Sequence, residues 1–150
     1  MSANTKYATA VHICIYLHYS ERKVIPSKEI AESVKTNPVV IRRLIHDLKE
    51  HDIVKSTSGP SGGFSLNKSA KNVSLWDIYM ATRDEEFFKR PQVNPDCVVS
   101  SHLKILVYDV FSEAEQSMKT VLQQTTIHDL EKNLEKIIGK DTQKAVKEGQ

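Results

Sequence analysis

Two adjacent arginines, Arg42 and Arg43, are the residues whose type and spacing most clearly suit chemistry with a ligand. A guanidinium group donates paired hydrogen bonds to guanine edges or to phosphate oxygens. Val39 and Val40 stand just before them, and their methyl groups suit contact with thymine methyls, although Val40 also suits a protein core. The group therefore suits DNA. The alternative is an ordinary amphipathic helix with a solvated charged face, and the neighbouring elements must decide between the two.

The two cysteines, Cys14 and Cys97, are the other candidates for reactive chemistry. Cys97 stands in a stretch without helical periodicity, where an accessible thiolate would react with oxidants or electrophiles. A metal site with Asp96 and His102 is a second interpretation, and an unpaired cysteine without a role is a third. Cys14 shares a face with apolar residues, where a thiol is most often an inert hydrophobic group. The remaining histidines show no ligand spacing: His12, His18, His46, His51 and His128.

The arginine pair belongs to a predicted helix that follows Asn37. Asn37 is a good N-cap, and Pro38 suits the first helical position. Apolar residues then recur with helical spacing and form one stripe: Ile41, Leu44, Ile45 and Leu48. The arginines fall on the opposite face. A short helix with a buried stripe and a basic outer face suits a DNA major groove.

Two more helices are predicted before this one. The first runs from Thr5 to about Tyr19, and its expected inward face is formed by Ala8, Val11, Cys14, Ile15 and His18. Val24 and Ile25 are expected to be extended, because Pro26 follows them. Ser27 is expected to cap the second helix. Two short helices joined by a tight turn predict a helix-turn-helix.

A hairpin is predicted directly after the third helix. Ile53 and Val54 begin one strand, and Phe64 and Leu66 alternate in the next. Between them lies the turn cluster Gly59-Pro60-Ser61-Gly62-Gly63, whose glycines permit positive φ and a close backbone approach to another molecule. A plain hairpin turn is the alternative, but the order of three helices and a hairpin indicates a wing that could enter a minor groove.

The second half of the chain is predicted to be mostly helical. Ser74 and Asp77 form a capping box for a short helix, in which Trp76 is expected to pack. Residues 83–100 show no clear periodicity and contain helix-breaking prolines, and a long helix is predicted over residues 101–123. Its apolar stripe needs a partner surface, which a second copy of the chain can supply. Thr126 opens a last helix, with Gly139 as its expected end.

The net charge of +2 is distributed unevenly. Residues 1–71 hold eleven Lys and Arg against six Asp and Glu, a net +5, whereas residues 72–150 hold ten against thirteen, a net −3. The basic half indicates an anionic partner. Lys6, Lys28 and Lys35 would supply salt-sensitive attraction. Ser27, Asn37 and the helix N-termini suit phosphate.

Composition narrows the functional classes further. A hydrophobic content of 39% with 27% charged residues fits a globular protein. No apolar run approaches membrane-spanning length and no signal pattern opens the chain, so a cytoplasmic protein is expected. Two cysteines without a CxxC fit a reducing compartment. The sequence has no nucleophile elbow, phosphate loop or metal signature, which argues against an enzyme.

In this order, the motifs resemble those of the Rrf-two family of bacterial winged-helix regulators, which includes iron–sulfur-cluster and nitric-oxide-sensing repressors. The likeness covers about residues 5–130, and the wing motif after the helix-turn-helix is its specific part. The matching residues are Tyr7-Ala8, Ser27-x-x-Ile30-Ala31, Asn37-Pro38-Val39-Val40, Leu44, Leu48, Gly59-Pro60-Ser61-Gly62-Gly63-Phe64-Ser65-Leu66 and Val73-Ser74-Leu75-x-Asp77-Ile78.

The resemblance implies a homodimer that places its third helices in the major groove, its wings in the minor groove and its long helices against each other. Two positions depart from the family pattern. Ser58 stands where the wing often has an arginine. Only Cys97 remains of the three closely spaced cysteines of cluster-binding members, and a cluster takes about four ligands, so no iron–sulfur cluster and no other cofactor is expected. Some relatives sense redox through a thiol on the first helix, which keeps Cys14 as a candidate below Cys97.

The prediction is therefore a mainly α protein with a small β-wing: a winged helix-turn-helix DNA-binding domain over residues 1–82, a sensor loop over 83–100, dimerisation helices over 101–139 and a polar tail over 140–150. Its expected function is a homodimeric, sequence-specific transcriptional repressor of a palindromic operator, with a redox, electrophile or metal signal; the alternative is a winged-helix module that binds protein. The predicted DNA contacts are Lys6, Ser27, Lys28, Asn37, Pro38, Val39, Val40, Arg42, Arg43, Ser56, Ser58, Ser61, Gly62 and Gly63. The sensor candidates are Cys97, Cys14 and His102, and the predicted dimer interface is Leu103, Leu106, Val107, Val110, Phe111, Ala114 and Met118.

Overall fold

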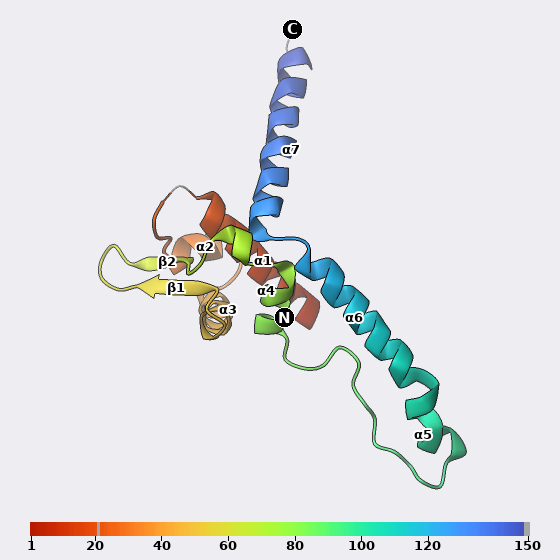
Figure 1. Cartoon of the computed structure of the whole chain (residues 1–150). Helices are drawn as coiled ribbons and strands as arrows, with labels where there is room; N and C mark the ends of the chain where they lie inside the picture. Colours follow the sequence, from red (N-terminus) through yellow and green to blue (C-terminus); the bar gives the residue numbers. More distant parts are fainter. Residues whose placement is uncertain (21, 149–150) are drawn as a thin grey trace.

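A computed structural model shows a small helical domain from which two long helices project in different directions (Figure 1). The structure describes residues 1–20 and 22–148, with side chains up to residue 140. The predicted class is confirmed, since helices dominate and two strands form one antiparallel sheet. The elements are α1 Ala3–Tyr19, α2 Ser27–Val34, α3 Pro38–Glu50, β1 Val54–Thr57, β2 Gly63–Leu66, the 3-10 turn Ala70–Asn72, α4 Leu75–Thr82, α5 Val98–Leu103, the π-helical segment Lys104–Tyr108, α6 Asp109–Gln123 and α7 Ile127–Glu148.

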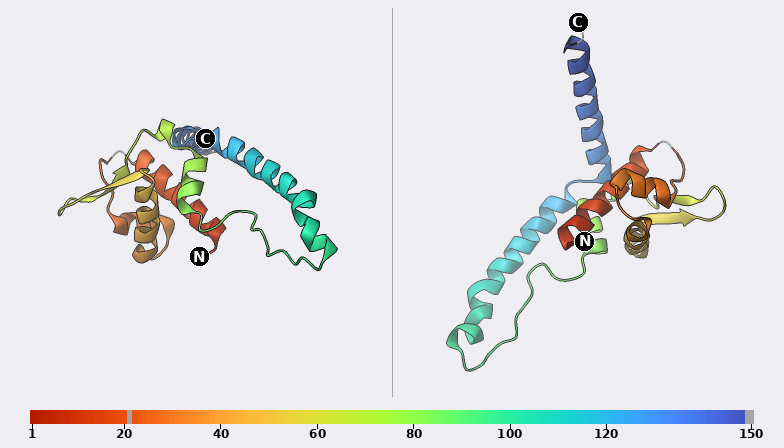
Figure 2. Two further views of the ribbon diagram at one scale, coloured as in Figure 1. Left: turned by 60° about the horizontal axis from the view of Figure 1, so that its bottom comes forward. Right: turned by 180° about the vertical axis from the view of Figure 1, so that it is seen from behind.

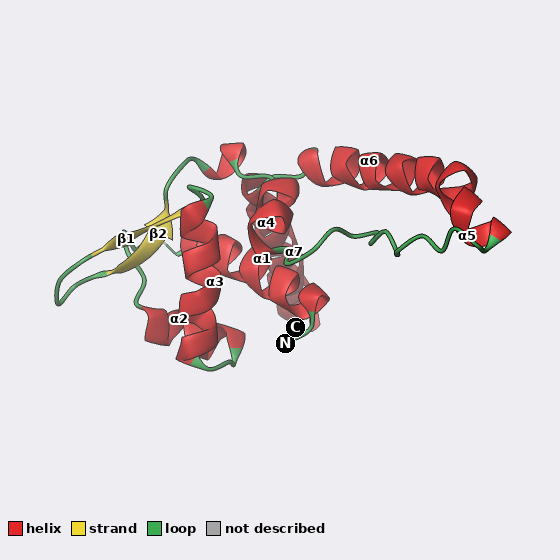
Figure 3. Ribbon diagram, turned by 90° about the horizontal axis from the view of Figure 1, so that it is seen from below, coloured by secondary structure: helices red, strands yellow, loops and turns green. Residues whose placement is uncertain are grey.

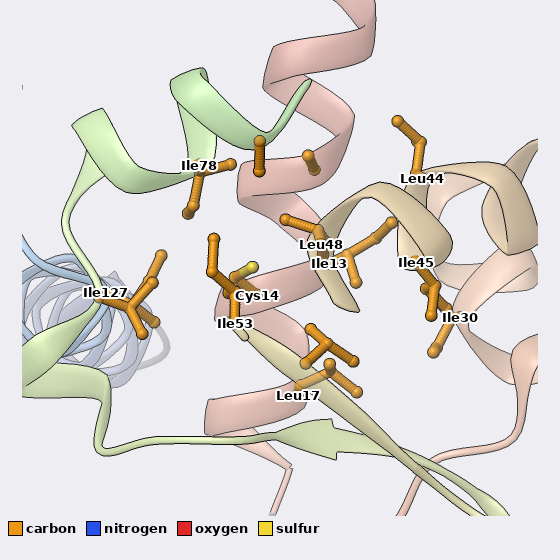
Figure 4. Packing of buried hydrophobic residues seen from close by; sticks show 14 of the residues in the cluster. Ile13, Cys14, Leu17, Ile30, Leu44, Ile45, Leu48, Ile53, Ile78 and Ile127 are labelled. Carbon is orange, nitrogen blue, oxygen red and sulfur yellow. The ribbon is translucent and has the colours of Figure 1, made fainter. Parts of the chain in front are cut away.

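The core of the domain is built around α1. Figure 4 shows Ile13 and Cys14 of α1 among side chains from α3, α4 and the start of α7, including Leu48, Ile78 and Ile127. All five are completely buried. Each large aliphatic side chain removed from water in this way contributes about 1.5–3 kcal/mol. α1 is therefore the element on which the other helices are positioned.

The predicted inward face of α1 is partly wrong. Cys14 is buried as expected, but Ala8 is exposed, and Ala10 and Ile13 are buried in its place. The cause is that α1 is covered on several sides, so apolar residues occur around most of its circumference and a single stripe cannot be read from them.

The helix-turn-helix forms as predicted, with one difference at its start. Asn37 caps α3, because its side chain accepts a hydrogen bond from the Val39 N–H at 2.8 Å. Lys35 adopts a left-handed conformation (φ 55°) in the turn that ends α2. Ser27 does not cap α2: it is the first helical residue, and Pro26 stands at the N-cap without a side-chain hydrogen bond.

The wing is a hairpin in which Val54 pairs with Leu66 and Thr57 with Gly63. The predicted extended segment at Ile25 is confirmed, and it forms a single β-bridge with Phe64 of the second strand. Ile25 and Phe64 exchange two backbone hydrogen bonds of 2.9 Å. The connection between α1 and α2 is thereby fixed to the second strand of the wing.

The end of α6 and the start of α7 meet at a common anchored point. The capping boxes at Ser74 and Thr126 are both present, and these two residues also form a β-bridge with each other. From this point α6 and α7 extend in different directions, and residues 83–97 lead from α4 out to the start of α5 on the same side of the domain as α6 (Figure 2). Trp76 packs as predicted: Lys119 of α6 lies 5.8 Å from the centre of its ring.

Three predicted helix boundaries are wrong. α1 begins at Ala3 rather than Thr5. The long helix begins at Val98 rather than Ser101 and includes the π-helical segment, so the loop before it is shorter than expected. α7 continues to Glu148 rather than ending at Gly139, so it covers most of the predicted polar tail. Glycine costs about 1 kcal/mol inside a helix and does not by itself end one.

Candidate nucleic-acid interface

The outer face of α3 presents the predicted base-reading side chains to solvent. Arg42, Arg43 and His46 are exposed, and Val39 is 52% exposed. Val40 is half-buried and packs against the core, which leaves less of its side chain for a ligand. Figure 3 shows α3 and the wing together on the side of the domain away from α6. The face that carries the arginines is therefore free of the chain's own long helices.

A groove of about 660 Å³ runs beside this face, between α3 and the start of α1. Its lining includes Met1, Lys6, Arg43 and His46. The start of α1 thus lies next to the residues predicted to contact DNA, although the two segments are distant in sequence.

Lys6 is half-buried and forms ion pairs with two carboxylates. Its ammonium lies 3.1 Å from Asp47 and 2.7 Å from Asp84. Burial would lower the pKa of Lys6, but the hydrogen bonds with Asp84 and Asp47 outweigh this and raise it. Lys6 thus joins α1 to Asp47 of α3, and the two carboxylates offset its charge; its contact with phosphate stays a prediction.

The other predicted phosphate contacts surround the start of α3. Lys28, Lys35 and Asn37 are exposed and line a shallow hollow at the turn between α2 and α3, with Pro38 beside them. Ser27 is half-buried at the first turn of α2. Backbone N–H groups at helix N-termini and nearby cations suit a phosphate backbone.

The wing exposes Ser58 and Ser61 at its tip. Ser56 is exposed on β1, where its hydroxyl accepts a hydrogen bond of 3.0 Å from Lys49 at the end of α3. This contact ties the wing to α3. Lys55 on the same strand is also exposed, and it was not among the predicted DNA contacts. Its positive charge at a solvent-facing strand position could have suggested it.

Contacts within the chain explain why glycine occupies positions 62 and 63 at the base of the turn. A Cβ on Gly62 would lie 2.3 Å from the Thr57 carbonyl oxygen, and one on Gly63 would lie 2.5 Å from that of Ile25. Gly59 has a φ of 107° with open space around it. Close approach to the chain's own backbone thus accounts for Gly62 and Gly63, which were predicted to permit approach to DNA.

The predicted dimer residues divide between two faces of the long helix. Leu106 and Val110 are each 61% exposed, and Ala114 is also exposed. Phe111, by contrast, stacks on Phe88 of the preceding loop with ring centres 4.3 Å apart. Half-buried members of the predicted set are Leu103, Val107 and Met118. The helix therefore uses part of its apolar surface within the chain and leaves the rest uncovered.

The two cysteines occupy different environments. Cys14 is completely buried, and burial raises the pKa of its thiol to about 12. Cys97 is half-buried at the N-cap of α5. His102 places its Nδ1 2.7 Å from the carbonyl oxygen of Val98. Within the described residues, Cys97 and His102 do not join Asp96 in a three-ligand group.

A three-ligand group that the sequence did not predict lies elsewhere. His18 of α1 meets His128 and Glu131 of α7, with ligand atoms within 4.8 Å of one another. The two histidines are 110 positions apart in the chain, so local spacing carried no signal of their meeting.

Among the described residues, the helices are too short or too polar for any of them to span a membrane.

Comparison with known proteins identifies the family. The sequence model of the Rrf2 family, described as an iron-dependent transcriptional regulator, matches residues 1–133. YwnA of Bacillus subtilis is 33% identical over 133 residues, which are 87% of this chain and 98% of YwnA. The HTH-type transcriptional regulator IscR of Pectobacterium carotovorum is 23% identical over 97% of this chain and 87% of IscR. The structure of CymR, the global cysteine regulator of B. subtilis, superposes with a TM-score of 0.66 at 22% identity, covering 89% of this chain and 96% of CymR. The chain belongs to the Rrf2 (Rrf-two) family of winged-helix, DNA-binding transcriptional regulators, which are not enzymes.

Proposed function

We propose that this regulator is a homodimer that binds a palindromic operator and represses transcription in the bacterial cytoplasm. The observation that carries the proposal is the uncovered face of α3, where Arg42 and Arg43 are exposed on the same side of the domain as the wing (Figure 3). An α-helix fits the major groove, and arginine discriminates guanine there by about 1–3 kcal/mol. A small, glycine-rich wing suits the adjacent minor groove.

The uncovered apolar face of the long helix supports the homodimer. Leu106, Val110 and Val121 are each more than 60% exposed on a helix that projects away from the core (Figure 1). Contiguous apolar surface of this kind marks an interaction site. A second copy offers the same face, and two-fold pairing is the commonest solution for such a surface. A two-fold dimer in turn reads a palindrome, with half-sites about 34 Å apart.

The family description names iron, and the cysteines do not fit an iron–sulfur cluster. Cys14 is enclosed in the core, whereas Cys97 lies at the start of α5, at the far end of the long helix (Figure 1). They cannot share one cluster, and a cluster takes about four ligands. We therefore propose that the chain binds no iron–sulfur cluster. Protein purified anaerobically and reconstituted with iron and sulfide is expected to show no visible cluster absorption above that of the Cys97→Ser variant.

We assign the signal-sensing role, if it uses a thiol, to Cys97. Burial and the raised thiol pKa make Cys14 a poor nucleophile. Cys97 is the more accessible thiol, and it stands where the loop meets the long helix. Oxidation at this point changes charge and size beside the proposed dimer interface.

The test is DNA binding by the full chain. Footprinting on the DNA upstream of its own gene, with and without oxidant, would locate the operator. Fluorescence anisotropy on that operator is then expected to show a loss of about 10- to 100-fold in affinity for Arg42→Ala and for Arg43→Ala. Lys136→Ala, which removes an exposed charge from α7, is the matched control and should bind as the unmodified chain does.

Unchanged operator binding by both arginine variants would refute the assignment of α3. A chain that binds no duplex at low salt, or whose binding does not weaken with added salt, would instead favour the module that binds protein. Increased transcription from the footprinted promoter in a deletion strain is the expected sign of repression.

A further inference from the structure

Three side chains with metal-binding atoms meet where the end of α1 lies against the first turns of α7. The Nε2 atom of His18 lies 3.0 Å from an Oε2 atom of Glu131, and Nδ1 of His128 lies 3.9 Å from the same oxygen. The ligand atoms of all three residues lie within 4.8 Å of one another. Glu131 is 15% exposed and each histidine 29%, so the group is partly shielded from solvent.

The contact between His18 and Glu131 is unusual for a hydrogen bond. Nε2 of His18 is buried, and among the described side chains it has no hydrogen-bond partner, although the carboxylate oxygen is only 3.0 Å away. A buried polar atom without a partner costs about 1–3 kcal/mol. A carboxylate can only accept, so a neutral imidazole nitrogen that faces it with its lone pair gains nothing. A cation placed between the two atoms would satisfy both.

The spacing of these atoms matches a metal site before it closes on its ion. Zinc binds nitrogen and oxygen ligands at about 2.0–2.2 Å, which puts neighbouring ligands of a tetrahedron roughly 3.4 Å apart. The two contacts to the Glu131 oxygen, 3.0 and 3.9 Å, lie on either side of this value. Small side-chain rotations are sufficient to bring all three groups to one ion.

We propose that His18, His128 and Glu131 bind one divalent transition-metal ion, with two imidazoles and one carboxylate as its protein ligands. This donor set suits Zn²⁺, and it also suits Fe²⁺. A hollow of about 710 Å³, lined by His18, Glu131 and Glu135, adjoins the group. The remaining coordination position therefore opens toward solvent and toward a second carboxylate one helical turn beyond Glu131.

Such an ion would fasten α7 to the central helix of the domain. His18 belongs to α1, whereas the other two ligands stand in the first turns of α7. Bound metal then stabilises the folded chain by mass action, because the unfolded chain does not hold the three ligands together. This site is independent of the DNA-binding face, so its test does not depend on the proposed operator.

The experiment uses the full chain after dialysis against a chelator. Titration with Co²⁺ is expected to give visible d–d absorption that saturates at one ion per chain and is displaced by Zn²⁺. Free Zn²⁺ at about 100 times its Kd should raise Tm by about 5–10 °C. Equilibrium dialysis with Zn²⁺ and, anaerobically, with Fe²⁺ identifies which ion is held more tightly.

Glu131→Gln and His128→Ala are expected to lose the Co²⁺ spectrum and the Tm shift. His12→Ala, which removes an exposed histidine from the same helix as His18, should retain both. Far-UV circular dichroism of each variant without metal checks that it is folded. The proposal would be overturned if the Co²⁺ absorption did not saturate at one ion in the unmodified chain. It would also be overturned if Glu131→Gln bound Co²⁺ as the unmodified chain does. His18 and Glu131 would then form an ion pair only.

Discussion

Replacing Gly63 with alanine tests whether the wing is positioned by the chain's own backbone. The added Cβ would lie 2.5 Å from the carbonyl oxygen of Ile25 and 2.6 Å from its carbonyl carbon. Both atoms are backbone, so no side chain can rotate away to make room. The connection between α1 and α2 must therefore separate from the second strand of the wing.

The cost follows from the contacts that hold these segments together. Ile25 and Phe64 exchange two backbone hydrogen bonds, each of 2.9 Å, and Ile25 is 1% exposed. Each hydrogen bond contributes about 0.5–1.5 kcal/mol net. Separation of the pair should lower the free energy of unfolding by about 2 kcal/mol, which corresponds to a decrease in Tm of roughly 4–8 °C for a chain of this size.

Thermal unfolding without DNA, followed by circular dichroism, measures this effect directly. Ser61→Ala is the control, because it changes an exposed residue at the tip of the same wing. It should unfold at the temperature of the unmodified chain. A Gly63→Ala variant with an unchanged Tm would refute the reasoning, and its glycine would then have to be explained by contact with DNA.

Three further predictions concern the thiols, the dimer and acid stability. At about pH 8 an alkylating reagent should modify Cys97 in the native chain and Cys14 only in denaturant, because burial raises the pKa of Cys14 to about 12; intact-mass spectrometry counts the adducts. Val110→Asp should weaken the dimer at least ~100-fold, measured by sedimentation, because an unpaired carboxylate would be buried in an apolar interface. Glu29 accepts hydrogen bonds from Arg22 and Tyr16, which hold its pKa below the ordinary value of 4.5. Its contribution to stability is therefore present above that value and is lost as pH falls through the lower folded value, so Glu29→Gln should lose less stability on acidification than the unmodified chain.

The dimer variant and the acid-stability variant each have a matched control on the same element. Ser112→Asp adds the same charge to an exposed position on another face of α6 and should leave the dimer intact. Glu32→Gln removes an exposed carboxylate from α2 and should follow the acid denaturation of the unmodified chain. Alkylation of Cys14 in the native chain would contradict the argument from its burial. A Ser112→Asp variant that is as monomeric as Val110→Asp would contradict the assigned interface. Identical acid transitions for Glu29→Gln and the unmodified chain would contradict the role given to Glu29.

Local signals in the sequence predicted local structure well. The caps at Asn37, Ser74 and Thr126 form as expected, because each depends on residues within three positions. The apolar stripe of α3 is buried for the same reason: its period alone decides which face turns inward. The family motifs extended these predictions to the order of the elements.

Features that depend on distant residues could not be predicted in the same way. The ion pairs of Lys6 with Asp47 and Asp84, and the meeting of His18 with α7, join segments that only the folded chain brings together. The end of α7 was missed for a different reason. Gly139 resembles a helix stop, but the residues after it contain no proline and tolerate a helix, so the helix continues.

The bridge between Ser74 and Thr126 fixes one end of the long helix to the domain, so the helix can tilt about this point, which serves as its fulcrum. Backbone hydrogen bonds of 2.9 Å, from Leu75 to Thr125 and from Ile127 to Val73, hold the fulcrum on both sides. At 1.5 Å per residue the arm over residues 98–123 is roughly 40 Å long, so a tilt of about 5° moves its tip by ~3.5 Å. In a dimer formed along these long helices, the same tilt moves the DNA-binding domain of one chain relative to that of the other. If the proposed dimer forms, the stiffness of this joint determines whether both α3 helices can contact one duplex at the same time.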